Sequence, residues 1–200
     1  MKIVIREGMF ETNSSSNHSL ILTNTKKCKA DIKKKDKQLD DEYCHIFGGG
    51  EKVASKEDKC LLLAGLFDGM VIQYGAMKEE YKIFIKVLRD NKEKELLAKI
   101  KENKKEYKNN RGYEPYCENY FAEGVLIDCT CDFKREFDKY FKVKLSMVDC
   151  LKDPRVKALE SQTDKFNKAE EIIEERKKEL YEKLHKFIYE DGIIVPYAHL

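Results

Sequence analysis

The sequence feature that most constrains the fold is a long amphipathic pattern near the C-terminal end, from Pro154 to Tyr189. Apolar residues recur in it every seven positions, at Leu159, Phe166, Ile173, Leu180 and Phe187. This spacing places one apolar stripe along a helix, so the pattern predicts a long helix over about residues 155–190. Because monomers rarely leave such a stripe exposed, another element must cover it.

A second amphipathic pattern runs over about residues 77–109, with a stripe of Tyr81, Phe84, Ile85, Leu88, Leu96, Leu97 and Ile100. Unbroken, that helix would be about 50 Å long. Two helices of matching length can bury their stripes against each other, which predicts a long antiparallel helical hairpin. Two roles stay open for it: it covers a sheet, or part of it protrudes as an arm that engages a protein partner or a second copy. The interface residues expected for the second role are Leu159, Phe166, Ile173 and Leu180.

Short apolar segments at both ends of the chain predict strands. Residues 2–6 and 19–23 are expected to be two N-terminal strands, and Gly192 ends the last helix before the β-branched run at 193–195. The C-terminal strand can pair with the N-terminal region. With 200 residues and 42% apolar content, we expect a single α+β domain over residues 1–200, with a small, mostly antiparallel sheet formed from both termini.

A polar loop joins the two N-terminal strands and is the first candidate site. Its candidate ligand-binding residues are Asn13, Ser14, Ser15, Ser16 and His18. Three interpretations remain open. The side chains satisfy backbone groups in a tight turn; or they form a nest for a phosphorylated ligand; or a serine is a nucleophile with His18 as base and Glu11 as the orienting group.

A glycine-rich turn is the second part of that candidate site, at Gly48, Gly49, Gly50 and Glu51. A short predicted strand precedes it, and Ser55 supplies an N-cap for a helix that follows. This order can aim backbone N–H groups at an anion, although the Gly-Lys-Ser/Thr ending of a P-loop is missing. A shared anion site requires the turn and the polar loop to be neighbours in space.

The segment 1–22, with its Phe-Glu-Thr-Asn-Ser-Ser-Ser-x-His-Ser-Leu signature, resembles the start of a family of small phage and prophage proteins of low-GC Gram-positive bacteria. The Phe-Gly-Gly-Gly-Glu turn and the segment 57–63 are similar to the family's glycine-rich turn and the helix after it. The resemblance covers about the first third of the chain. It implies a phage context and names no activity.

Seven cysteines in a chain that opens with a strand pattern in place of an export signal are expected to be reduced. The candidate metal ligands are Cys117, Cys129 and Cys131, and Cys129 and Cys131 form a Cys-x-Cys pair. Zinc requires four ligands, so a structural zinc site and ordinary buried thiols both remain open. A catalytic cysteine would need a base such as His18, His45 or His185 brought close by the fold.

The charge is nearly balanced, with 39 Lys and Arg against 37 Asp and Glu. The net charge of +2 gives no general field for polyanions, so nucleic acid is not expected as the main partner and would need a local patch. Residues 26–37 hold seven lysines, which form either a solvated loop or helix or a phosphate-contacting patch. No run approaches the roughly 20 apolar residues of a membrane span, so we expect a cytoplasmic protein without a membrane partner.

Two functional hypotheses follow. The first is a phage-encoded binding protein in the host bacterial cytosol, a counter-defence or host-takeover inhibitor that blocks a host protein complex through its helical arm. The second is a protein that sequesters or processes a nucleotide or cyclic oligonucleotide at the polar loop and glycine turn. A recognised catalytic motif is missing from the sequence, which favours the first and argues against an enzyme.

Overall fold

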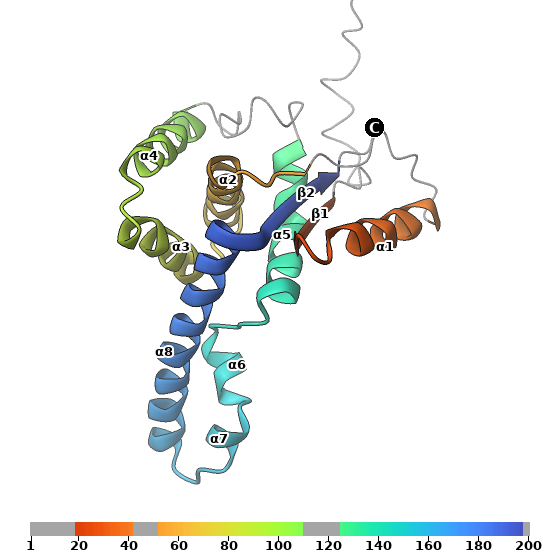
Figure 1. Ribbon diagram of the computed structural model, residues 1–200. Coiled ribbons are helices and arrows are strands. Elements are labelled where there is room, and N and C mark those ends of the chain that lie inside the picture. Colours follow the sequence, from red (N-terminus) through yellow and green to blue (C-terminus); the bar gives the residue numbers. More distant parts are fainter. Residues whose placement is uncertain (1–18, 42–51, 110–124, 198–200) are drawn as a thin grey trace, which may run out of the picture.

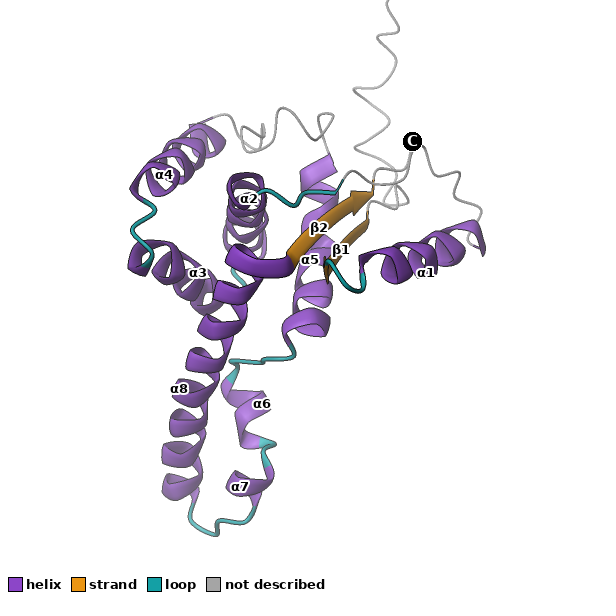
Figure 2. Ribbon diagram, in the orientation of Figure 1, coloured by secondary structure: helices purple, strands orange, loops and turns teal. Residues whose placement is uncertain are grey.

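A computed structural model describes residues 19–41, 52–109 and 125–197, and these form an α+β fold (Figures 1 and 2). The expected fold class is therefore confirmed. The elements are β1 (Ser19–Asn24), α1 (Cys28–Asp41), α2 (Lys56–Tyr74), α3 (Lys78–Asp90), α4 (Lys94–Asn109), α5 (Val125–Phe141), α6 (Met147–Leu151), α7 (Pro154–Lys157), α8 (Gln162–Lys186), the π-helix η1 (Phe187–Asp191) and β2 (Gly192–Tyr197).

The sheet pairs β1 with β2, in antiparallel register from Ser19 opposite Tyr197 to Asn24 opposite Gly192. On the other side of β2, Val53 forms a bridge with Ile194, with N to O distances of 2.8 and 3.1 Å. Both faces of the sheet are covered, which explains why neither strand alternates apolar with polar residues. One face packs on the main core, and α1 covers the other through a small cluster of Ile21, Cys28, Ile193 and Val195, with Ile32 at its edge.

Helix α2 lies at the centre of the molecule, between α4, α5, η1 and the sheet (Figure 1). From residue 59 to residue 70 it is buried on all sides apart from the half-buried Leu61, and its residues there are apolar apart from Lys59 and Asp68. As the sequence predicted, Ser55 caps its start by accepting a hydrogen bond from the Asp58 N–H at 3.1 Å. Gly75 ends it in the left-handed conformation, with φ 63°.

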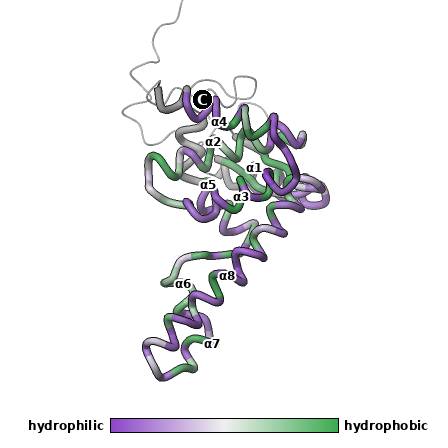
Figure 3. Tube along the Cα trace, turned by 90° about the vertical axis from the view of Figure 1, so that its left-hand side faces the viewer, coloured by the Kyte–Doolittle hydropathy of each residue, from purple (hydrophilic) through white to green (hydrophobic). Residues whose placement is uncertain are grey.

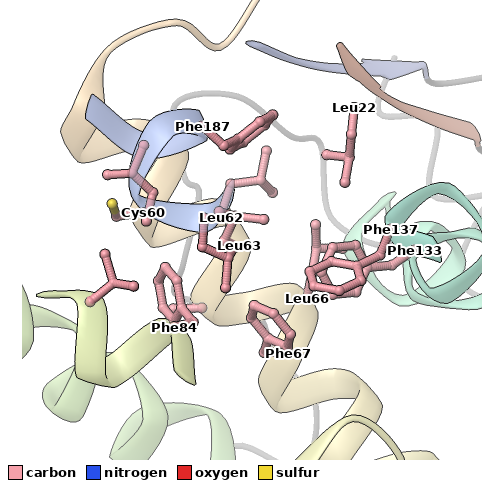
Figure 4. Packing of buried hydrophobic residues seen from close by; sticks show 14 of the residues in the cluster. Leu22, Cys60, Leu62, Leu63, Leu66, Phe67, Phe84, Phe133, Phe137 and Phe187 are labelled. Atoms are coloured by element: carbon pink, nitrogen blue, oxygen red, sulfur yellow. The ribbon is translucent and has the colours of Figure 1, made fainter. Parts of the chain in front are cut away.

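A ladder of aromatic rings joins α2 to α5 and to the end of the C-terminal helix (Figure 4). The ring centroids lie 5.1 Å apart for Phe67 and Phe133, 5.6 Å for Phe133 and Phe137, 4.5 Å for Phe137 and Phe141, and 5.6 Å for Phe141 and Phe187. The three phenylalanines of α5 are four residues apart and therefore share one face of the helix. All five rings are 1% exposed or less, so they lie in the interior of the core.

The single helix expected over residues 77–109 is instead two helices, α3 and α4. The break has a local cause: the Asn91 side chain donates to the Val87 carbonyl at 2.8 Å, and Lys92 adopts a left-handed φ of 60°. This lets α4 turn back onto α2. A buried polar group then fixes α4, because Asp68 on α2 accepts from Tyr81 at 3.1 Å and pairs with Lys104.

The helix expected over residues 155–190 is shorter in the structure. It begins at Gln162, and a π-helix follows its last residue, Lys186. Asp153 caps the separate short helix α7, and Ser161 caps α8. The chain between them is a turn that contains Leu159. The expected hairpin is reduced accordingly: α3 packs on only part of α8, and α6 and α7 pack on the rest.

One buried ammonium group holds the junction of α8, η1 and β2. Lys59 on α2 is 2% exposed, and its Nζ donates to the Phe187 carbonyl at 2.9 Å and the Gly192 carbonyl at 2.8 Å. The same Nζ lies 5.6 Å from the centre of the Phe187 ring. Burial lowers the pKa of Lys59, yet the charge is favourably placed beside carbonyl groups at the C-terminal end of a long helix.

Replacing Lys59 by Met should remove the ammonium donor from both carbonyls. Since an unsatisfied buried polar group costs about 1–3 kcal/mol, partly offset by removal of a buried charge, we expect the free energy of unfolding to fall by about 2–4 kcal/mol. Urea unfolding of the purified variant measures this. Lys52→Met is the matched control, because Lys52 is exposed, and it should change stability by less than about 0.5 kcal/mol. Equal stability of the Lys59→Met and Lys52→Met variants would show that Lys59 does not hold this junction.

Two neighbouring carboxylates at the start of α3 are in opposite environments. Glu80 is buried, and burial raises its pKa above the ordinary value, although Lys134 lies near enough to oppose this. Glu79 is more exposed, and its hydrogen bond from Lys82, at 2.6 Å, lowers its pKa. The negative charge of Glu80 therefore lowers the stability of the fold at neutral pH, whereas that of Glu79 does not.

Replacing Glu80 by Gln should stabilise the fold at pH 7. The folded pKa of Glu80 lies above the unfolded value of about 4.3, so its contribution is favourable below that pH and is lost as the pH rises through the folded pKa. The melting temperature of the variant should exceed that of the natural protein at pH 7 and equal it near pH 4. Glu79→Gln should show no gain at pH 7. A destabilised Glu80→Gln variant would mean that the charged form is favoured.

Candidate functional site: a protruding helical arm

Most of the sequence-predicted ligand and metal residues lie outside the described residues. This holds for Asn13, Ser14, Ser15, Ser16 and His18 in the polar loop, for Gly48, Gly49, Gly50 and Glu51 in the glycine turn, and for Cys117. The predicted proximity of loop and turn therefore stays a prediction. Cys129 and Cys131 lie within the helical backbone of α5. Zinc binding there stays a prediction as well.

The most prominent feature of the described chain is an arm, which we define as residues 142–178. It comprises an extended segment, α6, α7, the turn after them and the first part of α8. Figure 1 and the perpendicular view of Figure 3 both show it projecting from the rest of the molecule. The 17 residues of α8 within the arm span about 25 Å at 1.5 Å per residue.

Three N-terminal caps divide the arm into its short elements. Ser146 accepts from the Asp149 N–H at 3.1 Å, Asp153 from the Arg155 N–H at 3.1 Å, and Ser161 from the Asp164 N–H at 3.4 Å. Each cap satisfies an N–H group that has no partner inside its helix. These Ser-x-x-Asp and Asp-Pro patterns are helix-start signals, and they are the signals that would have placed the start of α8 at Gln162.

A small apolar cluster holds the arm together. Its fully buried members are Cys150, Val156, Ala169 and Ile172, and the partly buried Met147, Leu151 and Ile173 pack against it. The main core, by contrast, contains 27 buried residues within the described ranges alone. The arm thus has only a thin core of its own.

Polar contacts of Arg176 add to that thin core. Its Nη1 donates to the Lys144 carbonyl at 3.0 Å and lies 3.3 Å from the Cys150 Sγ, while Nη2 pairs with Asp153 at 3.2 Å. One guanidinium group on α8 thereby contacts the extended segment, α6 and the cap of α7. This planar, multi-donor role cannot be filled by lysine.

The arm is also fastened to the rest of the molecule. At the base of the arm, just beyond its two ends, Lys183 Nζ on α8 donates to the Phe141 carbonyl at the end of α5, at 2.7 Å. Lys177 lies 3.8 Å from Glu79 on α3. These contacts, with the continuity of α8 itself, give the arm a defined direction.

Two large apolar side chains of the arm are open to solvent. Val148 on α6 is 62% exposed, and Phe166 in the first turns of α8 is 44% exposed. Phe166 is three residues before the buried Ala169, and it lies exposed at the edge of the helix face that α6 and α7 cover. The apolar stripe of α8 therefore runs beyond its intramolecular cover.

The four predicted interface residues have different environments. Leu180 is fully buried in the main core, and Ile173 is half-buried against the arm cluster. Leu159 is half-buried in the turn before α8, and Phe166 is exposed. They do not face the 81–100 region along its length, because an α-helix drifts about 20° per seven residues and Ile172 replaces Ile173 at the buried position.

The described thiols and histidine are poor candidates for catalysis. Cys28, Cys60 and Cys150 are buried, and burial raises the pKa of Cys60 to about 12 and that of Cys150 above its ordinary value. Such thiols stay protonated and unreactive. His185 is half-buried, as expected, with Nε2 3.3 Å from the Asn91 Oδ1. Among the described side chains, no three His, Cys, Asp or Glu residues are arranged to hold a metal ion.

A helix that crosses a membrane is long and apolar. Within the described ranges, none combines the length and the apolar character needed to cross a bilayer.

Replacing Arg176 by Met should loosen the arm without unfolding the rest of the protein. The Lys144 carbonyl and Asp153 lose a donor, so backbone amides over residues 146–157 should exchange with deuterium at least tenfold faster, while α2 and α5 stay protected. Hydrogen exchange followed by mass spectrometry measures this. The neighbouring exposed Lys178→Met is the control and should leave the exchange unchanged. Unaltered protection in the Arg176 variant would show that the apolar cluster alone holds the arm.

No family model, curated protein or solved structure matches this chain. The resemblance of the first third to phage proteins therefore depends on its two motifs alone. A role for the arm follows only from the side chains on its own surface.

Proposed function

We propose that this chain is a binding protein without catalytic activity, whose arm engages a protein partner. The observation that carries the proposal is the exposed end of the apolar stripe, at Phe166, on an element that projects from the main body. An exposed aromatic side chain on a projecting helix is a common anchor of protein interfaces.

The energetics of the arm support this role. Each ordered residue costs about 1–2 kcal/mol of backbone entropy, and a fully buried aliphatic side chain returns about 1.5–3 kcal/mol. With four fully buried side chains in its own cluster, the arm gains little from its own packing and depends on Arg176 and on the main core. A partner that covers Phe166 and Val148 would add the burial that the arm itself does not supply.

The size of the arm also suits such a role. A standard protein interface buries about 800 Å² on each partner. A projecting element about 25 Å long, accessible from several sides, can provide such an area without rearrangement of the main core. Since large aromatic side chains dominate interface energies, Phe166 is the expected anchor.

For the biological setting, the resemblance of the N-terminal third points to a phage-encoded protein that acts in the host bacterial cytosol. In that setting the partner would be a host protein or complex, and binding would serve counter-defence or host takeover. Nucleotide binding at the polar loop and glycine turn depends on residues outside the described ranges, and no described contact favours it.

Replacing Phe166 and Val148 by Ser should abolish partner binding and leave the fold intact, because both side chains are already largely exposed. Affinity purification from host lysate with quantitative mass spectrometry should recover a partner with the natural protein and at least tenfold less with the double variant. Light scattering on the purified protein separates self-association from binding to a host protein.

Ile72→Ser is the matched control. Ile72 is 44% exposed, like Phe166, but lies on α2 and outside the arm. It should retain full binding. If the arm variant and this control bind equally well, the arm is not the interface, and if Ile72→Ser alone loses binding, the interface lies at the end of α2.

A further inference from the structure

Helix α1 is a second exposed element, separate from the arm (Figure 1). Its apolar side is used within the fold, because Cys28 is buried and Ile32 packs beside it against the outer face of the sheet. Asp31 is also turned inward, where the Thr23 hydroxyl donates to its carboxylate at 2.5 Å. Over its first two turns the outward side of α1 therefore carries no large apolar side chain, and apart from Ala30 its exposed residues are lysines.

Lysines occupy that outward side and the turn before it. Lys26, Lys27, Lys29, Lys33 and Lys34 are all exposed, and none forms an ion pair with another described residue. Elsewhere many basic side chains are paired, as Lys56 is with Glu93 and Lys134 with Asp138. The lysines at the start of α1 thus form an unpaired cationic patch, which we call the α1 lysine patch.

The charge distribution of the chain is more uneven than its total suggests. Residues 26–37 contain seven Lys and two Asp, a formal charge of +5, whereas the whole chain carries +2. The other residues together therefore carry −3. Within α1 the lysines come first, and Asp40 and Asp41 follow near the end. This order is the reverse of the one that the helix dipole favours, so stability of the helix does not explain the patch.

We propose that the α1 lysine patch contacts the phosphate backbone of double-stranded DNA. The sequence left a solvated helix and a phosphate-contacting patch as alternatives for these lysines. The five exposed lysines at the start of this helix, none of them ion-paired with a described residue, favour the second. The contact is local, as the small net charge requires, and it is independent of the arm.

The chemistry of the patch distinguishes DNA from other polyanions. An interfacial membrane helix inserts apolar side chains beside its lysines, but those of α1 are buried against the sheet. Protein interfaces depend on aromatic residues and arginine, and residues 26–41 contain neither. Single strands are bound by stacking on aromatic rings, and sequence-specific RNA recognition uses the same stacking on unpaired bases, for which residues 26–41 offer no ring. Lysines alone suit the backbone of a DNA duplex, without sequence preference.

The test is a titration of the full-length protein against a short, fluorescently labelled DNA duplex of mixed sequence, at several salt concentrations. The natural protein should bind at low salt with an affinity that falls steeply as salt increases. In the triple variant Lys29→Gln, Lys33→Gln, Lys34→Gln, the slope of log affinity against log salt should decrease in magnitude by about 2 to 3, since each phosphate contact contributes about 0.9.

A variant with the same change in net charge is the control: Lys78→Gln, Lys101→Gln, Lys178→Gln, three exposed lysines outside the patch. Its slope should equal that of the natural protein, and both variants should keep the natural melting temperature. The proposal is overturned if the two variants lose affinity equally. It is also overturned if the natural protein binds single strands, duplex RNA, polyglutamate or anionic vesicles as tightly as it binds the DNA duplex.

Discussion

The buried ammonium of Lys59 is the interaction on which the rest of the structure depends, because it joins α2 to the start of η1 and of β2, which lie 128 and 133 residues later in the sequence. It binds carbonyl groups at each end of η1, where α8 gives way to β2. The same junction requires glycine at position 192, since a Cβ atom there would lie 2.2 Å from the Phe187 carbonyl oxygen. These two residues fix the angle between α8 and the sheet, and this angle sets the direction in which the arm projects.

The sequence was sufficient for features that depend on local pattern. The strands expected at 19–23 and 193–195, their pairing, the helix after Ser55 and the stop at Gly192 all follow from apolar runs and capping residues, and the structure confirms them. The strand expected at 2–6 lies outside the described residues and stays a prediction. The break at Asn91 and Lys92 was not predictable in the same way. Neither residue is Gly or Pro, and the break depends on a side-chain hydrogen bond to Val87 and on the space beside α2 that α4 fills.

The arm was predicted only in part, because its cover and its polar contacts depend on the folded arrangement and not on a local sequence pattern. A repeat of seven implied a single stripe and a single covering helix, but the actual helix divides its stripe between the main core at Leu180 and the arm cluster at Ile172. The cover over the arm consists of α6 and α7, which are too short to give a periodic signal. Arg176 was missed because a charged residue on an amphipathic helix normally faces water, and only the folded arrangement brings three acceptors within its reach.

The two sides of the arm differ in how firmly they are held, and this difference bears on binding. Helix α8 continues without interruption from the main core, where Leu184 and Leu180 are fully buried, into the arm, so its orientation is set before any partner arrives. A rigid binding element loses little conformational entropy on association, which favours affinity. On the other side, α6 and α7 are held by four small or medium-sized buried side chains and one arginine. A partner that docks on Phe166 would therefore meet a rigid helix beside a segment of low local stability, which can adjust to the shape of the partner without cost to the main core.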